Sequence, residues 1–282
     1  MSDSAQPPST GATADHRKKA GLRMPNAAWA WEHLRRNPDY QRDYRRARAG
    51  RQRPVHLSTG ATLIRERRRW PDAEKWGLLT FADPEQSALD ADVFWSPSLL
   101  AGSLPVRLYP LEDEKSAVNS HHNEIVLSAI PTRRALLETV DGARHTLMRG
   151  QRFWVQLYCD RPASLGDSGC VGLKINGAKY YKRRLDTADQ LLSLYQSTGG
   201  KLSLIGRSKD TTRLTQGLIA YDIEQSGGTH RDIAMAIYGR ELIAREWGSS
   251  GRYYEDWTRR LVNRVHSLVN SGYKEFLTKK TL

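Results

Sequence analysis

The chain of 282 residues carries 44 Lys and Arg against 31 Asp and Glu, a formal net charge of +13. This length is enough for two ordinary domains, and the excess charge favours a polyanionic partner: DNA, RNA or an anionic membrane surface. The only two cysteines, Cys159 and Cys170, are too few for a disulfide scaffold and favour a cytoplasmic protein. The sequence has neither a signal-peptide core nor a run of about eighteen apolar residues, so we expect no secretion and no membrane span.

Changes in composition divide the chain into four segments. Residues 1–23 are rich in Ser, Ala, Pro, Thr and Gly and are predicted to form a disordered tail. Residues 24–110 are expected to form a small, Trp-rich interaction or regulatory domain. An acidic break predicts a linker over 111–123. Residues 124–282 are expected to form the C-terminal domain, with a helical core over 212–277, so the predicted fold class is α+β.

The N-terminal domain is expected to begin with helices. Asn26 is a suitable N-cap for a helix that carries Trp29 and Leu34. After an Asn-Pro-Asp break, a second amphipathic helix is predicted over 40–49. Apolar runs then predict short strands at 76–81, 93–95 and 106–109.

Most of the excess positive charge lies near the N-terminus. Residues 1–70 contain sixteen Lys and Arg against six Asp and Glu, an excess of ten. The basic region 40–69 leaves three interpretations open: contact with DNA, contact with RNA polymerase, or no partner at all. We favour DNA because the charge is densest there.

The second half opens with a β-rich segment. Asp141-Gly142 is typical of a hairpin turn, because this pair tolerates positive φ. Alternating or β-branched residues predict strands at 124–130, 153–157 and 171–175, with Asn176-Gly177 as a further turn. After these strands, residues 188–196 have helical periodicity, and Gly199-Gly200 follows them.

From Thr212 onward the sequence predicts helices. One is expected over 213–225, ended by two glycines. The next begins with Thr229 and Asp232, which are three residues apart as in a capping box, and ends at Gly239, expected to adopt the left-handed αL conformation. A short capped helix of this kind is typical of the first helix of a helix-turn-helix motif.

The last helix is predicted over 251–268, so the turn before it, 240–248, is longer than in the standard motif. The inward stripe is expected to consist of Tyr254, Trp257, Leu261, Val265 and Leu268. The opposite face is rich in Arg and Asn, which pair well with guanine and adenine, although an ordinary amphipathic surface helix would give a similar pattern. The residues expected to contact DNA are Arg231, Arg240, Arg252, Arg259, Arg260, Asn263, Arg264 and His266.

Other chemistry is less well supported. Gly166-Asp167-Ser168-Gly169 resembles the loop of a trypsin-like nucleophile, but no element supplies the base, so we predict no catalytic residues and no enzyme. His121-His122 with Glu124, and Cys159 with Cys170, do not have metal-ligand spacing, so no metal is expected. No phosphate-binding glycine loop occurs, no cofactor is predicted, and a tyrosine-recombinase interpretation lacks a catalytic pattern.

The helical motifs resemble a bacterial family. The C-terminal motifs are similar to those of an extended-turn helix-turn-helix domain found in regulators of integrative and conjugative elements. The residues that carry this resemblance are Ile233-Ala234, Ile237-Tyr238-Gly239, Trp247, Trp257 and Gly272-Tyr273. The segments around Trp29-Ala30-Trp31 and Trp76-Gly77-Leu78 are similar to the domain that precedes it, so the chain resembles an FseA-type activator over about residues 24–110 and 140–282.

The resemblance implies a DNA-binding transcriptional activator of genes for excision and conjugative transfer of a mobile element, which is a form of horizontal gene transfer. It implies double-stranded promoter DNA as partner, with RNA polymerase and an acidic antiactivator that binds the N-terminal domain as further partners. Two alternatives remain open: a protein-interaction module, as in the antiactivators, and an RNA-binding regulator.

Overall fold

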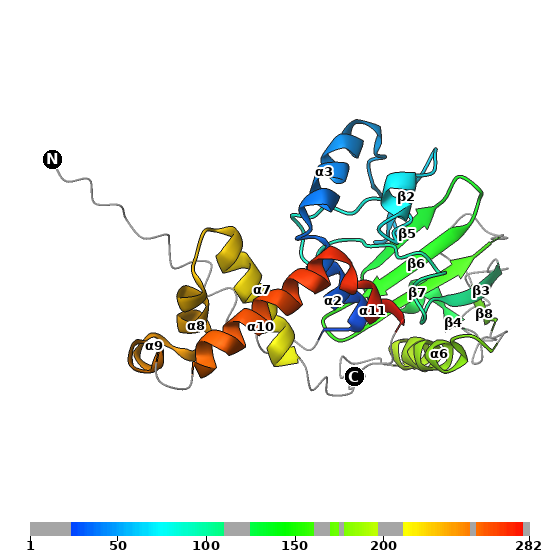
Figure 1. The fold of residues 1–282 in the computed structure, drawn as a ribbon. Helices are drawn as coiled ribbons and strands as arrows, with labels where there is room; N and C mark the ends of the chain where they lie inside the picture. The colour runs from blue at the N-terminus through cyan, green and yellow to red at the C-terminus, as the bar shows by residue number, and fades with distance from the viewer. Residues whose placement is uncertain are drawn as a thin grey trace. The chain divides into compact units, whose positions relative to one another are not determined.

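The computed structural model describes residues 24–109, 125–160, 170–174, 178–196, 211–248 and 252–278. The predicted tail at 1–23 and the predicted linker at 111–123 lie outside these residues. The chain divides into two compact units (Figure 1). One, here called the sheet unit, comprises residues 24–206 and 271–281, and the other, the helical unit, comprises 207–270.

The sheet unit contains one mixed sheet of eight strands in the order β1-β2-β5-β6-β7-β3-β8-β4 (Figure 1). Neighbouring strands are antiparallel except for the parallel pairs β2–β5 and β3–β7. The strands are β1 (Val55–His56), β2 (Thr62–Arg65), β3 (Leu104–Tyr109), β4 (Ile125–Val126), β5 (Arg134–Glu138), β6 (Arg144–Arg149), β7 (Trp154–Cys159) and β8 (Cys170–Leu173).

The sheet places the division of the chain elsewhere than the sequence predicts. Strands from both sides of the predicted linker pair with each other, because β3 lies between β7 and β8 and β2 pairs with β5. Apolar strands that precede the linker thus bury their backbone polar groups and side chains against strands that follow it. Among the described residues, those of 24–206 and 271–278 form one unit, and those of 207–270 form the other.

The central hairpin agrees with its local sequence. Thr139 N donates to Ala143 O at 3.0 Å, and Gly142 has a φ of 82°, as predicted for the Asp141-Gly142 turn. The turn sets the register of β5 and β6, so that Leu136 lies opposite Thr146. All six residues of β6 are buried.

The helices of the sheet unit differ from the prediction mainly at their ends. Pro25, and not Asn26, is the N-cap of the first helix, and no side chain caps it. The predicted strands at 76–81 and 93–95 form only an isolated bridge between Leu78 and Trp95, because the chain turns at Gly77, with a φ of 84°. The helical segments are α2 (Asn26–Leu34), α3 (Pro38–Ala47), the 3-10 turn η1 (Arg48–Gly50), α4 (Pro71–Glu74), the 3-10 turn η2 (Leu127–Ala129) and α6 (Tyr181–Gln196).

The main core of the sheet unit is aromatic and includes the C-terminal end of the chain. Trp31 and Trp95 are fully buried in it, together with Tyr273 and Leu277. Leu277 lies in α11 (Lys274–Thr278), and Ala101 N donates to Leu277 O at 2.9 Å. Tyr273 and Leu277 therefore complete a core that also contains residues of α2.

The helical unit consists of α7 (Thr211–Gln225), α8 (His230–Tyr238), α9 (Arg240–Glu246) and α10 (Tyr253–Ser267), followed by a π-helical turn, Leu268–Gly272. The α+β class is confirmed. No helix in the described part of the chain is both long enough and apolar enough to cross a membrane.

Candidate nucleic-acid interface

Helix α8 begins at a complete capping box. Thr229 Oγ1 accepts from Asp232 N at 3.3 Å, and Asp232 Oδ2 accepts from Thr229 N at 2.8 Å. The hydrogen bond from the Thr229 side chain is the main reason that the pKa of the Asp232 carboxyl is lowered. The predicted cap is confirmed, and it fixes where the helix starts.

Helices α7, α8 and α10 pack around a small core. Ala220 of α7, Ile233 of α8 and Val262 of α10 are buried against one another. A second contact joins Tyr221 to Val265 and Val269. Ala234 is also fully buried, so this small side chain of α8 lies inside.

The long turn before α10 contains a helix of its own. Gly239 ends α8 and precedes α9, with φ 101° and ψ 145°, so it has the predicted positive φ but not the αL conformation. Helix α9 buries Ile243. The predicted extended turn is therefore a short amphipathic helix held by one apolar anchor.

The buried stripe of α10 agrees with the predicted one in part. Val265 and Leu268 are buried as predicted. Thr258 and Val262 are also buried, whereas their predicted neighbours Trp257 and Leu261 are only half-buried. Thr258 can lie inside because its hydroxyl donates to the Tyr254 carbonyl oxygen at 2.7 Å.

Aromatic rings join the end of α8 to the beginning of α10. The ring of Tyr238 lies 4.9 Å from that of Tyr254 and 5.0 Å from that of Trp257, in both cases edge to face. Burial, and to a lesser extent the neighbouring tyrosines Tyr253 and Tyr254, raises the pKa of Tyr238 to about 12. These contacts fix the first turns of α10 against α8.

Four predicted contact residues share the outer face of α10: Arg259, Arg260, Asn263 and Arg264 are all exposed. Their spacing of three and four residues places them side by side on the helix. The Arg259 guanidinium donates to Asp256 Oδ1 at 2.9 Å, and Arg260 Nε donates to the Asp256 carbonyl oxygen at 3.2 Å.

Three other predicted residues lie at the edges of the motif. Arg252 precedes α10, with a φ of 42° and Nε 3.5 Å from Glu255 Oε2. Arg231 is in the first turn of α8, and Arg240 is the first residue of α9. All three are exposed.

His266 is half-buried, unlike the exposed arginines of α10. Its imidazole contacts the Glu224 carboxylate of α7, and its ring lies 5.2 Å from that of Tyr221. The periodicity of a single helix does not reveal this contact, because the partner residues are in another helix. We therefore assign His266 to the packing of α10 on α7.

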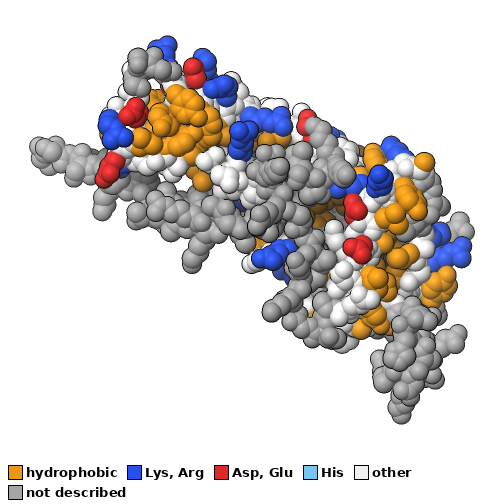
Figure 2. Space-filling view, turned by 90° about the horizontal axis from the view of Figure 1, so that it is seen from below, with side chains coloured by type: hydrophobic (Ala, Val, Ile, Leu, Met, Phe, Trp, Pro, Cys, Tyr) orange, Lys and Arg blue, Asp and Glu red, His pale blue; other side chains and the backbone are white. Residues whose placement is uncertain are grey.

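The helical unit has almost no net charge, although one of its helix faces is basic. Residues 211–270 contain eight Arg and seven Asp and Glu, so their balance is only one positive charge. On the face drawn in Figure 2, Lys and Arg side chains border hydrophobic areas, with acidic side chains among them. The outer face of α10 is basic because its two acidic residues, Glu255 and Asp256, are confined to the first turn.

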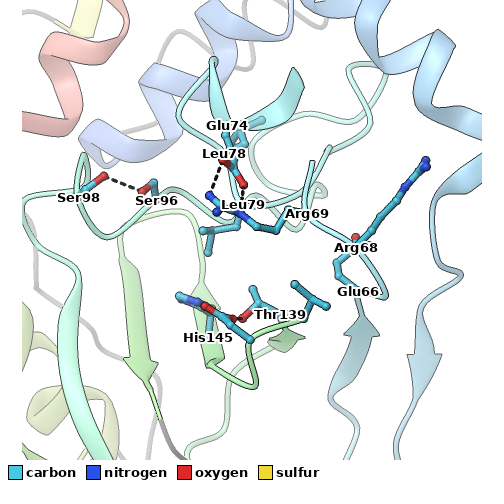
Figure 3. Close-up of a pocket in the computed structure, with 12 residues that line it drawn as sticks. Glu66, Arg68, Arg69, Glu74, Leu78, Leu79, Ser96, Ser98, Thr139 and His145 are labelled. Atoms are coloured by element: carbon cyan, nitrogen blue, oxygen red, sulfur yellow. Dashed lines mark hydrogen bonds and ion pairs between the residues drawn. The ribbon is translucent and has the colours of Figure 1, made fainter. Parts of the chain in front are cut away.

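A polar pocket of about 460 Å³ in the sheet unit is a second candidate, and the sequence did not indicate it. Figure 3 shows Arg69 and Glu74 on one side of it and Thr139 and His145 on the other. Arg69 donates two hydrogen bonds to Glu74, at 2.9 and 2.8 Å, so this arginine is already occupied. His145 is 4 % exposed, and its burial lowers the pKa to about 4, which leaves the ring neutral near pH 7.

The residues considered for catalysis or metal binding are not grouped in the described part of the chain. Cys159 and Cys170 are buried and form no disulfide. The serine loop at 166–169 and the pair His121-His122 lie outside the described residues. Within the residues that the structure covers, no three His, Cys, Asp or Glu side chains are grouped to hold a metal ion.

Two family models match the chain. One, described as "T6SS, Transcription factor, DNA binding domain", matches residues 176–278, which include the whole helical unit. The other, described as "Proteobacterial transcriptional regulator-like domain", matches residues 13–79. A search of curated proteins found no match. Both descriptions name regulators, and together they support a DNA-binding transcriptional regulator.

Proposed function

We propose that this DNA-binding transcriptional regulator reads promoter DNA with a helix-turn-helix variant in which α8 positions α10 and α10 enters the major groove. The observation that carries the proposal is the exposed row of Arg260, Asn263 and Arg264 on a helix whose opposite side is packed on α7 and α8. Such a helix presents one fixed polar face, as groove recognition requires.

The side chains of that row suit base edges. Arginine binds guanine O6 and N7 with two hydrogen bonds, and asparagine binds adenine N6 and N7 in the same way. Arg259 is bonded to Asp256, so we assign it to phosphate contact or to orientation of its neighbours. Arg231 and Arg240 are proposed phosphate contacts, because they lie outside α10.

The test begins with selection of binding sites from fragmented genomic DNA by the purified chain. Binding of a selected duplex by Arg260→Ala and Asn263→Ala is then measured by fluorescence anisotropy. Each substitution is expected to weaken binding by roughly 1–3 kcal/mol, or about 5- to 150-fold, and to relax the preference at one base pair.

A matched control separates recognition of base pairs from non-specific electrostatic attraction to DNA. Arg213→Ala removes the same charge from an exposed position in the first turn of α7. It is expected to change affinity for specific and random duplexes equally and only slightly. If Arg213→Ala and Arg260→Ala weaken specific binding to the same degree, α10 is not the recognition helix. Stronger binding to RNA than to duplex DNA would favour an RNA-binding regulator instead.

We further propose that the regulated genes are those for excision and conjugative transfer of a mobile element, and that the chain activates them. The sequence motifs of α8, α10 and the N-terminal helices support this proposal. The matched DNA-binding domain is described as that of a T6SS transcription factor, so genes of that system are the main competing target. Mapping of bound sites in the host, with reporter fusions to the nearest promoters, decides between the two sets of genes and between activation and repression.

A further inference from the structure

The sheet unit has a basic edge that the proposed recognition helix does not use. It surrounds the C-terminal end of α3 and is defined here by Arg45, Arg46, Arg51 and Arg68. Three of these arginines are exposed and Arg51 is half-buried. Arg68 reaches this edge from the segment that follows β2, because a Cβ added at Gly50, which ends the turn after α3, would lie 2.9 Å from Arg68 Cζ.

Helix α3 directs its arginines outward. Tyr40 and Asp43 are its buried residues, and the Asp43 carboxylate is occupied by Lys75 Nζ at 2.7 Å and Trp76 Nε1 at 3.0 Å. Among the described residues, Arg45 and Arg46 have no carboxylate within ion-pair distance, and Arg46 acts on Asp43 only as a minor cause of its lowered pKa. Arg42 on the same helix differs, because it is paired with Asp39.

The other two arginines are held by aromatic rings. The Arg51 guanidinium carbon lies 3.8 Å from the centre of the Tyr44 ring, and that of Arg68 lies 4.0 Å from the centre of the Trp70 ring. Figure 3 shows the Arg68 side chain extending away from the other pocket residues. Stacking restricts these side chains without neutralising their charge, so little further entropy is lost when they bind an anion.

From this geometry we propose that the basic edge contacts the sugar-phosphate backbone of duplex DNA, independently of sequence. The proposal builds on the function proposed above, in which α10 reads the bases of the same DNA. Four arginines around one helix end, two of them prearranged, form the kind of surface that phosphates recognise. Residues 24–70 have an excess of eight positive charges, which then has a role in attraction that the nearly neutral residues 211–270 do not supply.

The competing explanation is local. Basic residues in the last turn of a helix interact favourably with its dipole, so Arg45 and Arg46 would stabilise α3 without any ligand. An acidic protein partner would use the same charges. These explanations differ from DNA contact in one measurable quantity, the salt dependence of DNA affinity.

The experiment compares two double variants of the full chain with equal net charge. Arg45→Gln with Arg46→Gln removes two unpaired arginines from the basic edge. Arg42→Gln with Arg65→Gln removes two exposed arginines that are paired with Asp39 and Glu138. Affinity for a random-sequence duplex and for a selected duplex is measured across a salt series by fluorescence anisotropy.

We expect the first double variant to lose affinity for both duplexes by the same factor, about tenfold or more at low salt. The slope of log K against log salt should become shallower by about 2, since each lost phosphate contact contributes roughly 0.9. The control double variant should keep the wild-type slope. Gly50→Ala, which displaces Arg68 without changing any charge, should also weaken binding to both duplexes.

An unchanged slope in Arg45→Gln with Arg46→Gln overturns the proposal, and so does an equal loss in the control. The random duplex keeps this result separate from the proposed function. A failure of recognition by α10 removes the preference for the selected duplex but leaves binding to the random one. If the basic edge does not contact DNA, the variant with Arg45→Gln and Arg46→Gln keeps both its preference for the selected duplex and the wild-type salt slope.

Discussion

Replacement of Tyr273 with alanine should destabilise the sheet unit, although this residue follows directly after the helices of the helical unit in the sequence. The side chain is fully buried, its ring lies 6.1 Å from that of Trp95, and its hydroxyl donates to the Trp76 carbonyl oxygen at 2.9 Å. Removal of a buried aromatic ring typically costs about 3–5 kcal/mol. Tyr273→Phe keeps the ring and removes one hydrogen bond to a partly buried carbonyl, which should cost about 1 kcal/mol.

Tryptophan fluorescence in a urea titration measures this effect. Six of the eight tryptophans lie in the sheet unit and two, Trp247 and Trp257, in the helical unit. In a background with both of these replaced by phenylalanine, the emission reports the sheet unit alone. Tyr273→Ala should then lower the urea midpoint, and Tyr273→Phe should lower it about a quarter as much. An unchanged midpoint in Tyr273→Ala would show that the C-terminal residues do not belong to this core.

Three further predictions concern caps, turns and protonation. Thr229→Ala should lower the thermal stability of the helical unit by about 1 kcal/mol, measured by circular dichroism, whereas Thr229→Ser, which keeps the cap hydroxyl, should have little effect. Gly239→Ala should cost about 1–3 kcal/mol in the same assay because φ is 101°, while Ala236→Gly, on an exposed position of α8, should cost no more than about 1 kcal/mol. Because the pKa of His145 is about 4 in the folded chain and near 6.5 when unfolded, the unfolded state binds the proton more tightly. The free energy of unfolding should therefore fall by up to roughly 3 kcal/mol between pH 6.5 and pH 4, and His145→Gln should remove that part of the pH dependence.

The features that the sequence predicts well are local ones. Thr229 and Asp232 satisfy each other's hydrogen bonds within one turn, and Asp141-Gly142 turns the chain within four residues, so neither depends on distant partners. The outer face of α10 is predicted for the same reason. When the apolar face of this helix is buried, the arginines on the opposite face are exposed.

The features that sequence reasoning misses depend on distant partners. Strand β2 has only four residues and follows a basic stretch, and it is a strand because β5 pairs with it from about seventy residues further along the chain. The apolar run at 76–81 looks like a strand but is buried without a ladder, a difference that periodicity does not reveal. The contact of His266 with Glu224, and the pairing of strands across the predicted linker, escape sequence reasoning for the same cause, since the partners are in other elements.

The position of α11 has a consequence for the order of synthesis. The first helix of the sheet unit leaves the ribosome when most of the sheet is still untranslated, and its core stays incomplete until Tyr273 and Leu277 have been made. The helical unit, 207–270, is translated before that point. A transcript cut short or shifted in frame after α10 therefore yields a chain with an unfinished sheet unit, which proteolysis removes more readily than the full chain. This arrangement couples the supply of complete helical units to completion of the sheet unit.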